Sequence, residues 1–409
     1  MRITILTQYY PPEIGAPQGR LSDLAERIVR AGHQVHVLTA MPSYPQGRIY
    51  PGYGGLMSRE LHNGVEIVRS FVYPTRSVST LPRLANYFSF LLSSSMLGSF
   101  ALDHSDYLMV ESPPLFLGVG GIWLSRLKRA RLIFNVSDLW PDSAVHLGVI
   151  SRDSRAYRVG RRLESICYRR AWLVTGQSQG ILDDIHGRFC GIHTLLLSNG
   201  SDTGVFNPIR RSNSARARLT RSREFVVLYA GLHGIAQGLG HIIEAAKRLT
   251  GEEGYRFVFI GDGPEKADLI AGAEGCDNVT FMDPVPLDQM PELLASADVL
   301  LVPLARDLPG AVPSKLYEAM ASGRPLVLMA NGEPAAIVNR HQAGVVVSTG
   351  DVPGLVNALR SLRADPARAS TIAANARCAA VKYYDRAQIA AGFIAYLEKS
   401  HSDASRPEI

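Results

Sequence analysis

Short apolar runs alternate along most of the chain with apolar residues at helical spacing. Arg2–Thr7 and Gln34–Thr39 predict strands, and Leu21, Leu24 and Ile28 between them recur at the spacing of one helix face. Further runs in the first half also predict strands: Val65–Phe71, Asp106–Glu111, Arg131–Val136, Ala171–Thr175 and His193–Leu197. Strands that alternate with helices are typical of an α/β fold with a parallel sheet.

The alternation begins again in the second half. Apolar runs there predict strands over Phe225–Ala230, Arg256–Ile260, Asn278–Met282, Val299–Pro303, Pro325–Met329 and Gly344–Val347. Before them, Asn207–Arg223 is polar and basic without apolar periodicity, and we interpret it as an interdomain linker or an exposed edge.

A chain of 409 residues is too long for one hydrophobic core. We therefore expect two doubly wound, Rossmann-like domains with parallel sheets, facing each other across a cleft. The first would cover residues 1–205 and the second residues 206–384. A C-terminal helix over 385–409 would return to the first domain.

Leu84–Leu102 is a long stretch without a charged residue. It contains five serines and Asn86, which makes it a poor membrane-spanning helix. Asn86, Ser89 and Ser93 share one helical face, and apolar residues widen the other. A helix that is buried, or one that lies in a membrane interface, fits better, and of the two we expect burial.

Composition places the chain among soluble globular proteins, with 46% hydrophobic and 20% charged residues. The net charge is only +6, but arginine and lysine gather in three clusters, around residues 126–131, 158–170 and 210–223. Such clusters suit anionic lipid, nucleic acid or phosphorylated substrates, or they form solvated helix faces.

Four cysteines without Cys-x-x-Cys spacing indicate neither a zinc site nor a disulfide framework. A reducing cytosol is the simplest compartment for them. The apolar run Ile3–Leu6 is too short for a signal peptide.

The candidate chemistry centres on Pro313–Pro325. A predicted strand and a loop precede it, and Gly323 and Pro325 end its predicted helix. Pro313 and Ser314 suit the first helical turn, with Ser314 as a candidate N-cap. A helix N-terminus at the carboxyl end of a strand binds anions in open α/β sheets, and Lys315 would add a charge there. Glu318 could accept hydrogen bonds from ligand hydroxyls; alternatively it is a solvated residue of an ordinary crossover.

Glycine-rich loops follow other predicted strands. Gly15 lies in the first, Gly231–Gly238 forms the second, and Gly261–Lys266 lacks the final glycine of a dinucleotide fingerprint. Asp138 follows the strand Arg131–Val136, where catalytic groups of α/β folds lie, although Asp138 or Ser137 could equally cap the next segment.

The order and spacing of these motifs resemble family-four retaining glycosyltransferases, which have the two-domain GT-B fold. The resemblance rests on Pro11-Pro12 with Gly15, Gly32–Val35, Ser198–Asp202, Gly261–Pro264, Ala297–Val299 and above all Glu318–Val327. Asp138–Pro141 and His233–Gly238 are similar to a subgroup that includes N-acetylfucosaminyl transferases of bacterial O-antigen (lipopolysaccharide) and colanic acid synthesis. This implies a UDP-linked donor, such as an N-acetylated amino sugar, and a lipid-linked (polyprenyl diphosphate) glycan acceptor.

The resemblance also implies roles for individual residues. Glu318 would hold the ribose hydroxyls, Lys315 the diphosphate, and Asp138 would act as a base or orient a hydroxyl. The implied donor-binding residues are Gly15, His233, Gln237, Pro284, Val285, Gly310, Ala311, Pro313, Ser314, Lys315, Leu316 and Glu318.

The sequence departs from the family pattern at residues expected to bind the diphosphate and the sugar of the donor. Gly310 stands where the family has an acidic residue, and Leu232 and Gln237 stand where it has an arginine and a lysine. Lys315, His233 and the N–H groups of Gly310–Ser314 would replace the missing cations.

We expect no metal and no further cofactor. The alternatives are a sugar-nucleotide 2-epimerase of the same fold and a non-catalytic scaffold on a membrane surface. The expected location is the cytoplasm, peripherally on the inner face of the cell membrane and without contact to nucleic acid.

Overall fold

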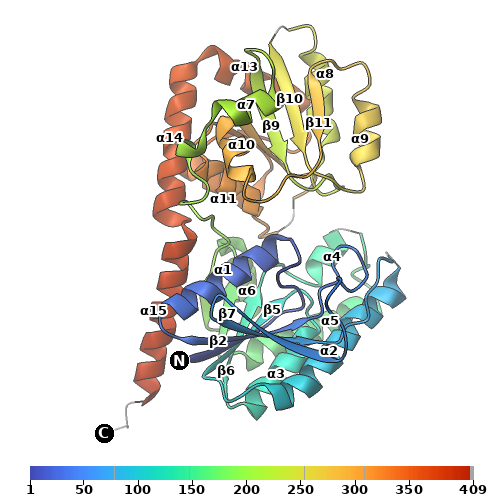
Figure 1. Ribbon diagram of the computed structural model, residues 1–409, viewed down its shortest axis with the longest axis vertical. Helices are drawn as coiled ribbons and strands as arrows, with labels where there is room; N and C mark the ends of the chain where they lie inside the picture. Colours follow the sequence, from blue (N-terminus) through green and yellow to red (C-terminus); the bar gives the residue numbers. More distant parts are fainter. Residues whose placement is uncertain (78, 147, 253, 308, 406–409) are drawn as a thin grey trace. The chain divides into compact units, whose positions relative to one another are not determined.

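The computed structural model describes the chain except residues 78, 147, 253, 308 and 406–409 (Figure 1). It divides into two compact units, one of Met1–Ser198 with Ala387–Ile409 and one of Asn199–Arg386. The sequence placed this division after residue 205 and the return at residue 385. Each unit is a predominantly parallel sheet with helices on both faces, which confirms the predicted α/β fold class.

The sheet of the first unit has the order β3-β4-β2-β1-β5-β6-β7-β8. Its strands are β1 (Arg2–Leu6), β2 (Gln34–Ala40), β3 (Met57–His62), β4 (Val65–Ser70), β5 (Tyr107–Ser112), β6 (Arg131–Val136), β7 (Leu173–Gly176) and β8 (Thr194–Leu196). All pairs are parallel except β3 with β4, which form a hairpin through Asn63 and Gly64, both at positive φ. Our sequence analysis missed β3 because its residues are mostly polar and exposed.

Two helical layers cover this sheet. Its helices are α1 (Ala16–Arg30), α2 (Thr80–Ala101), α3 (Leu117–Leu127), α4 (Asp142–His146), α5 (Arg155–Arg170), α6 (Gln179–Arg188) and α15 (Arg386–Ser405). The helices α2, α3, α5 and α6 share one core with the sheet, and α1 and α15 share the other. The hydroxyl of Tyr107 donates to the carbonyl of Leu397, 2.9 Å away, and so ties α15 to β5.

The helix α2 is half-buried rather than buried. Phe90, Ser94 and Gly98 face the core, whereas Leu92 and Met96 are exposed. This differs from the burial that we expected for Leu84–Leu102, because only one side of the helix meets the sheet. None of the described helices combines the length and apolarity that crossing a membrane requires.

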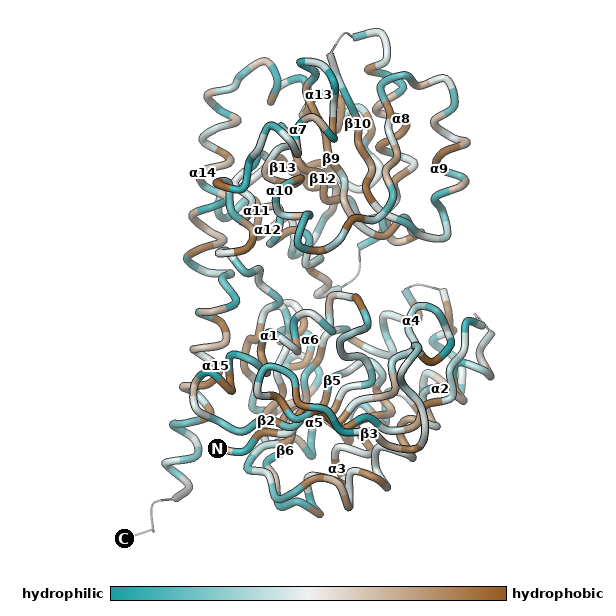
Figure 2. Tube along the Cα trace, viewed as in Figure 1, coloured by the Kyte–Doolittle hydropathy of each residue, from teal (hydrophilic) through white to brown (hydrophobic). Residues whose placement is uncertain are grey.

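The second unit has a six-stranded, fully parallel sheet of the order β11-β10-β9-β12-β13-β14. Its strands are β9 (Phe225–Ala230), β10 (Tyr255–Ile260), β11 (Val279–Met282), β12 (Val299–Pro303), β13 (Leu326–Met329) and β14 (Val345–Val347). Figure 2 shows hydrophobic residues concentrated along the strands β9 and β10.

The helices of this unit cover both sheet faces. They are α7 (Asn213–Leu219), α8 (Gly240–Arg248), α9 (Lys266–Gly272), α10 (Met290–Ser296), α11 (Ser314–Ala321), α12 (Gly332–His341), α13 (Val352–Ala364) and α14 (Pro366–Tyr383), with a 3₁₀ turn at Pro208–Arg210. The helix α9 and the helix α12 were not predicted.

The stretch Asn207–Arg223 is part of the second unit, so its interpretation as a linker was wrong. It contains α7, whose N-cap Ser212 accepts a hydrogen bond from the backbone of Ala215. Ala215 and Leu219 are buried in one of the two cores. Two apolar residues in a basic stretch are too few to produce a periodic signal.

Candidate functional site

The strand order of the second unit reverses at β9. The chain runs from β9 outward to β10 and β11, and then returns to β12 on the other side of β9. The loops after β9 and β12 therefore part at their carboxyl ends, where open α/β sheets bind ligands. Gly231 follows β9, and Lys315 lies in the first turn of α11 after β12.

Lys315 lies directly against Gly231. A Cβ atom built on Gly231 would be 1.9 Å from Cε and 2.6 Å from Nζ of Lys315, and the φ of Gly231 is +150°. Only glycine leaves room for the lysine here. Within the described part of the chain the amine forms no hydrogen bond or ion pair. A cation is thus held at the switch point without an ion pair to any described residue.

Glu318 lies one turn further along α11. Burial raises the pKa of Glu318, and Lys315 opposes this shift; burial also lowers the pKa of Lys315, opposed by Glu318. The N-cap of α11 is Pro313 and no side chain caps it, so the prediction that Ser314 is the cap was wrong. The first N–H groups of the helix are therefore not taken by a capping side chain.

His233 is fully buried in the glycine loop after β9. Neither ring nitrogen has a hydrogen-bond partner among the described residues. The rings of Tyr229, Phe259 and Phe281 surround it at centroid distances of 6.0, 6.4 and 6.1 Å. Burial, and then the charge of Lys266, lower the pKa of His233. This favours a neutral imidazole and speaks against His233 as a cationic partner of a diphosphate.

Gln237 lies at the end of the same loop. Its Oε1 is buried and has no partner among the described residues. A backbone bond of 2.8 Å from Ala305 to Ala236 joins this loop to the segment after β12. The loop after β9 is therefore tied by its backbone to the segment that follows β12.

The loops after β9 and β10 interlock through their backbones. The N–H of His233 donates to the carbonyl of Asp262 at 2.9 Å, and Glu265 donates to the carbonyl of His233 at 3.0 Å. A Cβ on Gly261 would lie 1.9 Å from the carbonyl oxygen of Gly231, and one on Gly263 would lie 2.3 Å from that of His233. These close backbone contacts explain why glycine occupies positions 261 and 263.

The remaining predicted donor residues lie at other strand ends. Pro284 and Val285 follow the edge strand β11, and Val285 packs against the core. Gly310 and Ala311 precede α11, and Gly310 has a φ of +72°. A residue with a side chain is disfavoured at position 310 in this conformation.

In the first unit, Gly15 is the N-cap of α1 and begins a helix of 15 residues. Its backbone is extended, with a φ of 173°, and a Cβ there would lie 2.4 Å from Oε1 of Gln18, so the glutamine side chain would have to move to make room for it. That oxygen is buried without a partner among the described residues.

Asp138 follows β6 and is half-buried. Burial raises its pKa, whereas hydrogen bonds from the Ser143 hydroxyl and the Leu139 backbone lower it. The bond from Ser143 to Oδ1 fixes the orientation of the carboxylate. Both predictions for Asp138, a catalytic group and a cap, are compatible with this position.

A buried polar network at the ends of β5 and β6 escaped our sequence analysis. Arg20 of α1 donates to Glu111 at 2.6 Å and to the Ser137 hydroxyl at 3.0 Å. Glu111 also accepts from Asn135 and Ser137, and Gln177 donates to Ser137. The one signal in the sequence was a glutamate at the end of an otherwise apolar strand.

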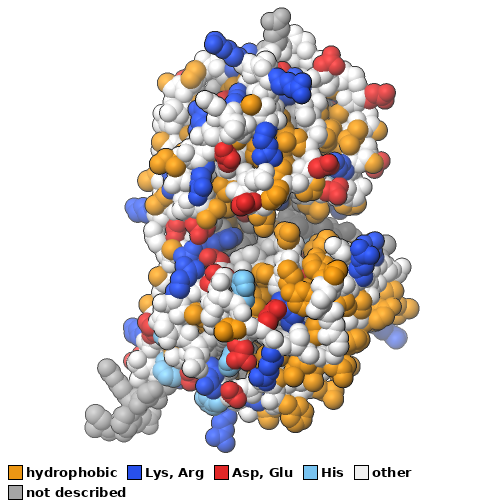
Figure 3. Space-filling model, in the orientation of Figure 1, with side chains coloured by type: hydrophobic (Ala, Val, Ile, Leu, Met, Phe, Trp, Pro, Cys, Tyr) orange, Lys and Arg blue, Asp and Glu red, His pale blue; other side chains and the backbone are white. Residues whose placement is uncertain are grey.

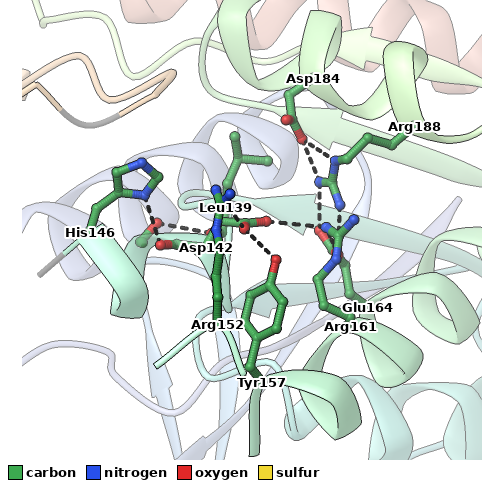
Figure 4. Close-up of polar contacts among 10 residues, drawn as sticks. Leu139, Asp142, His146, Arg152, Tyr157, Arg161, Glu164, Asp184 and Arg188 are labelled. Atoms are coloured by element: carbon green, nitrogen blue, oxygen red, sulfur yellow. Dashed lines mark hydrogen bonds and ion pairs between the residues drawn. The ribbon is translucent and has the colours of Figure 1, made fainter. Parts of the chain in front are cut away.

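A second cluster of charges fixes the helices α4, α5 and α6 next to Asp138 (Figure 4). Asp142 accepts from Tyr157 at 2.8 Å and from Arg161 at 3.1 Å. Arg188 donates to both oxygens of Glu164, which is fully buried, at 2.8 and 2.7 Å. These side chains satisfy one another and form a scaffold rather than a site.

The structure thus brings Lys315, Glu318 and His233 to one region of the second unit, and places Gly15 and Asp138 in the first. In the described part of the chain, no group of three histidine, cysteine, aspartate or glutamate residues could hold a metal ion. Metal independence stays a prediction.

Family models match both halves of the chain. Residues 15–200 match the model "Glycosyl transferase 4-like domain", and residues 224–365 match "Glycosyl transferases group 1". The chain is 27% identical to the putative colanic acid biosynthesis glycosyl transferase WcaI of Escherichia coli, over 81% of this chain and 83% of that protein. It is 29% identical to the probable glycosyltransferase WbjE of Pseudomonas aeruginosa, over 54% of each.

Solved structures share the fold over the whole chain. A sucrose-phosphate synthase from Thermosynechococcus elongatus has a TM-score of 0.76 at 18% identity and covers 99% of this chain and 100% of its own. Anabaena HepE, solved with UDP-glucose, has a TM-score of 0.71 at 19% identity and covers 98% and 100%. The two family models, which together cover most of the chain, identify it as a glycosyltransferase of the family-four type, and the solved structures share its GT-B fold.

Proposed function

We propose that the protein transfers a sugar, such as an N-acetylated amino sugar, from a UDP-sugar to a lipid-linked glycan, with retention of the anomeric configuration. The observation that carries this proposal is the position of Lys315, which is held over Gly231 at the switch point of the second unit and forms no hydrogen bond or ion pair with a described residue. A diphosphate would supply the missing negative charge, and the uncapped N-terminus of α11 would add N–H donors. The WcaI relative and the UDP-glucose complex of HepE support the choice of substrates.

The proposed roles follow from position and charge. Lys315 stabilises the diphosphate, whose charge grows as the bond from the anomeric carbon to the phosphate oxygen breaks. The Glu318 carboxylate accepts hydrogen bonds from the ribose hydroxyls. The acceptor oxygen forms the new bond to the anomeric carbon, and its proton passes to the leaving phosphate oxygen. Asp138, oriented by Ser143, positions a substrate hydroxyl.

Calorimetric titration of the whole chain with UDP, GDP, ADP and CDP tests the donor site. We expect UDP to bind most tightly and Glu318→Ala to weaken it about 20-fold, the effect of losing hydrogen bonds to a charged group. Titration of wild type and Glu318→Ala with 2′-deoxy-UDP and 3′-deoxy-UDP is the matched control. The substitution should not change the affinity for the analogue that lacks the hydroxyl bound by Glu318. Equal UDP affinity of wild type and Glu318→Ala would refute the ribose assignment.

Incubation with labelled UDP-N-acetylhexosamines and a polyprenyl diphosphate-linked acceptor tests the reaction. Label in the lipid phase, with NMR evidence of a retained anomeric configuration, is the expected result. A UDP-sugar that changes only at C2 would instead support the epimerase, and no turnover with any donor would support the scaffold.

A further inference from the structure

Exposed apolar side chains form stripes on two neighbouring helices of the first unit. On α2 they recur every four residues, as Phe88, Leu92, Met96 and Phe100, and α3 adds Val119, Trp123 and Leu127. Phe100 is 88% exposed, Met96 66% and Trp123 57%. Both helices pack on the same side of the sheet, so their outer sides face the same way. In Figure 3, hydrophobic side chains gather over this part of the unit.

The polar side of α2 is turned toward the protein. The Ser89 hydroxyl accepts from the backbone of Tyr73 at 2.8 Å, and Asn86 accepts from Gln8 at 2.7 Å. Ser93 binds Ser70 and the carbonyl of Phe71. A helix at a protein–water boundary normally has the opposite polarity, with its polar side outward. The outward side of α2 is therefore apolar, unlike that of an ordinary amphipathic helix at the surface of a protein.

The two helices are also held together closely. The indole N–H of Trp123 donates to the Ser99 hydroxyl at 3.2 Å, and the Lys128 amine donates to the carbonyl of Ser99 at 2.8 Å. Gly120 leaves room for Leu91 and Ser95 of α2. The two stripes thus lie on one rigid surface.

The exposed charges on α2, α3 and α5 have one sign. Across α2, α3 and the adjacent α5, the one acidic residue is Glu164, which is buried and paired with Arg161 and Arg188. The exposed cations of the three helices are Arg83, Arg126, Arg155, Arg158, Arg162, Arg169 and Arg170. None of these seven forms an ion pair with a carboxylate of the described residues. Arg126, Arg129, Arg131 and Arg170 line a groove of about 370 Å³ where α3 and α5 end.

We propose that this surface, formed by the outer sides of α2, α3 and α5, docks onto an anionic lipid bilayer. The apolar stripes would enter the boundary between headgroups and acyl chains, and the arginines would meet the headgroups, as in interfacial amphipathic helices. A second copy of the chain fits less well, because a two-fold interface would place the same arginines against each other. The inference extends the proposed lipid-linked acceptor but does not depend on the donor site.

Flotation of the full chain with vesicles tests the surface. The chain should float with phosphatidylglycerol-containing vesicles, and more weakly with phosphatidylcholine alone. Met96→Glu with Phe100→Glu should abolish flotation, because carboxylates would enter the apolar boundary. Arg158→Gln with Arg162→Gln should weaken binding to anionic vesicles about 30-fold. Ile209→Glu is the matched control, since Ile209 is 86% exposed but belongs to the second unit.

Two further measurements separate docking from misfolding and from the donor site. The tryptophan fluorescence of wild type should shift to shorter wavelengths with anionic vesicles and be quenched by brominated lipid. Trp123→Phe should remove most of this shift and quenching. Each variant should bind UDP as wild type does, which shows that it is folded. Equal flotation of wild type and the α2 variant would overturn the proposal. So would a dimer that the α2 substitutions dissociate, because the occupant would then be a second copy.

Discussion

Each unit carries a cationic and an acidic side chain near the carboxyl end of its sheet, but the two side chains are paired in one unit and not in the other. In the first unit, Arg20 and Glu111 lie 2.6 Å apart, and Ser137 and Asn135 satisfy the rest of the carboxylate. In the second, Lys315 and Glu318 influence each other's pKa but form no ion pair, and both lack an internal hydrogen bond among the described residues. A paired charge holds the fold together, whereas an unpaired one is available to a ligand. The proposed donor site accordingly lies in the second unit.

Removing one partner of the ion pair between Arg20 and Glu111 should have the largest effect, a loss of stability. Glu111→Ala leaves the Arg20 guanidinium buried without its carboxylate, so we expect a loss of about 3–5 kcal/mol in the free energy of unfolding. Urea denaturation measures it. The control is Glu66→Gln, which removes the solvent-accessible contacts of Glu66 with Arg59 at 3.3 Å and His36 at 3.2 Å and should change stability by less than about 1 kcal/mol.

The UDP affinity of Glu111→Ala at low temperature should stay that of wild type, because the substitution lies in the other unit. A weakened UDP affinity in a folded Glu111→Ala protein would contradict the division of roles between the two units.

Removing the unpaired cation should affect catalysis rather than folding. Lys315→Met should lower kcat about 10²-fold, the effect of losing one stabilising contact to a charge that develops in the transition state. Its stability should not fall, because Lys315 forms no hydrogen bond or ion pair with a described residue and burial already disfavours its charged form. Lys266→Met is the control, since Lys266 already pairs with Asp283 at 2.7 Å. Wild-type turnover in Lys315→Met would remove Lys315 from the diphosphate site.

The half-buried pair of Glu224 and Arg256 in the second unit should have the smallest effect on stability and a defined pH dependence. Hydrogen bonds from Arg256 lower the pKa of Glu224 to about 2. A depressed carboxylate pKa stabilises the fold above the unfolded pKa of about 4.3, and this stability is lost as the pH falls toward 2. Glu224→Gln should therefore cost about 1 kcal/mol at pH 7 and progressively less below pH 4.5. Urea denaturation from pH 7 to pH 3 follows the difference, and a pH-independent difference would contradict the ion-pair origin.

Local patterns predicted much of the fold. The strand Val299–Pro303 and the helix after Pro313 were correctly placed, because an apolar run followed by proline and glycine signals is complete within a few residues. The hairpin strand Met57–His62 and the helix Asn213–Leu219 were missed because few of their residues are apolar.

The sites depend on contacts that no local pattern contains. Lys315 meets Gly231 only because the strand order brings β9 next to β12, and the sequence did not specify that order. The network of Arg20, Glu111 and Gln177 joins three elements through buried polar groups, which hydrophobic periodicity does not register. The serines of α2 suggested a polar face, but not that this face turns inward.

The interlocked loops after β9 and β10 limit which residues at the carboxyl end of the second sheet can vary. Gly261 and Gly263 touch the opposite backbone so closely that any side chain would displace it, and a selection from a randomised library should return glycine at both positions. Leu232 and Ile235, which are exposed in the neighbouring loop, carry no such constraint. Substitutions are therefore accessible at these two exposed positions, whereas Gly261 and Gly263 stay invariant as the support of the loop.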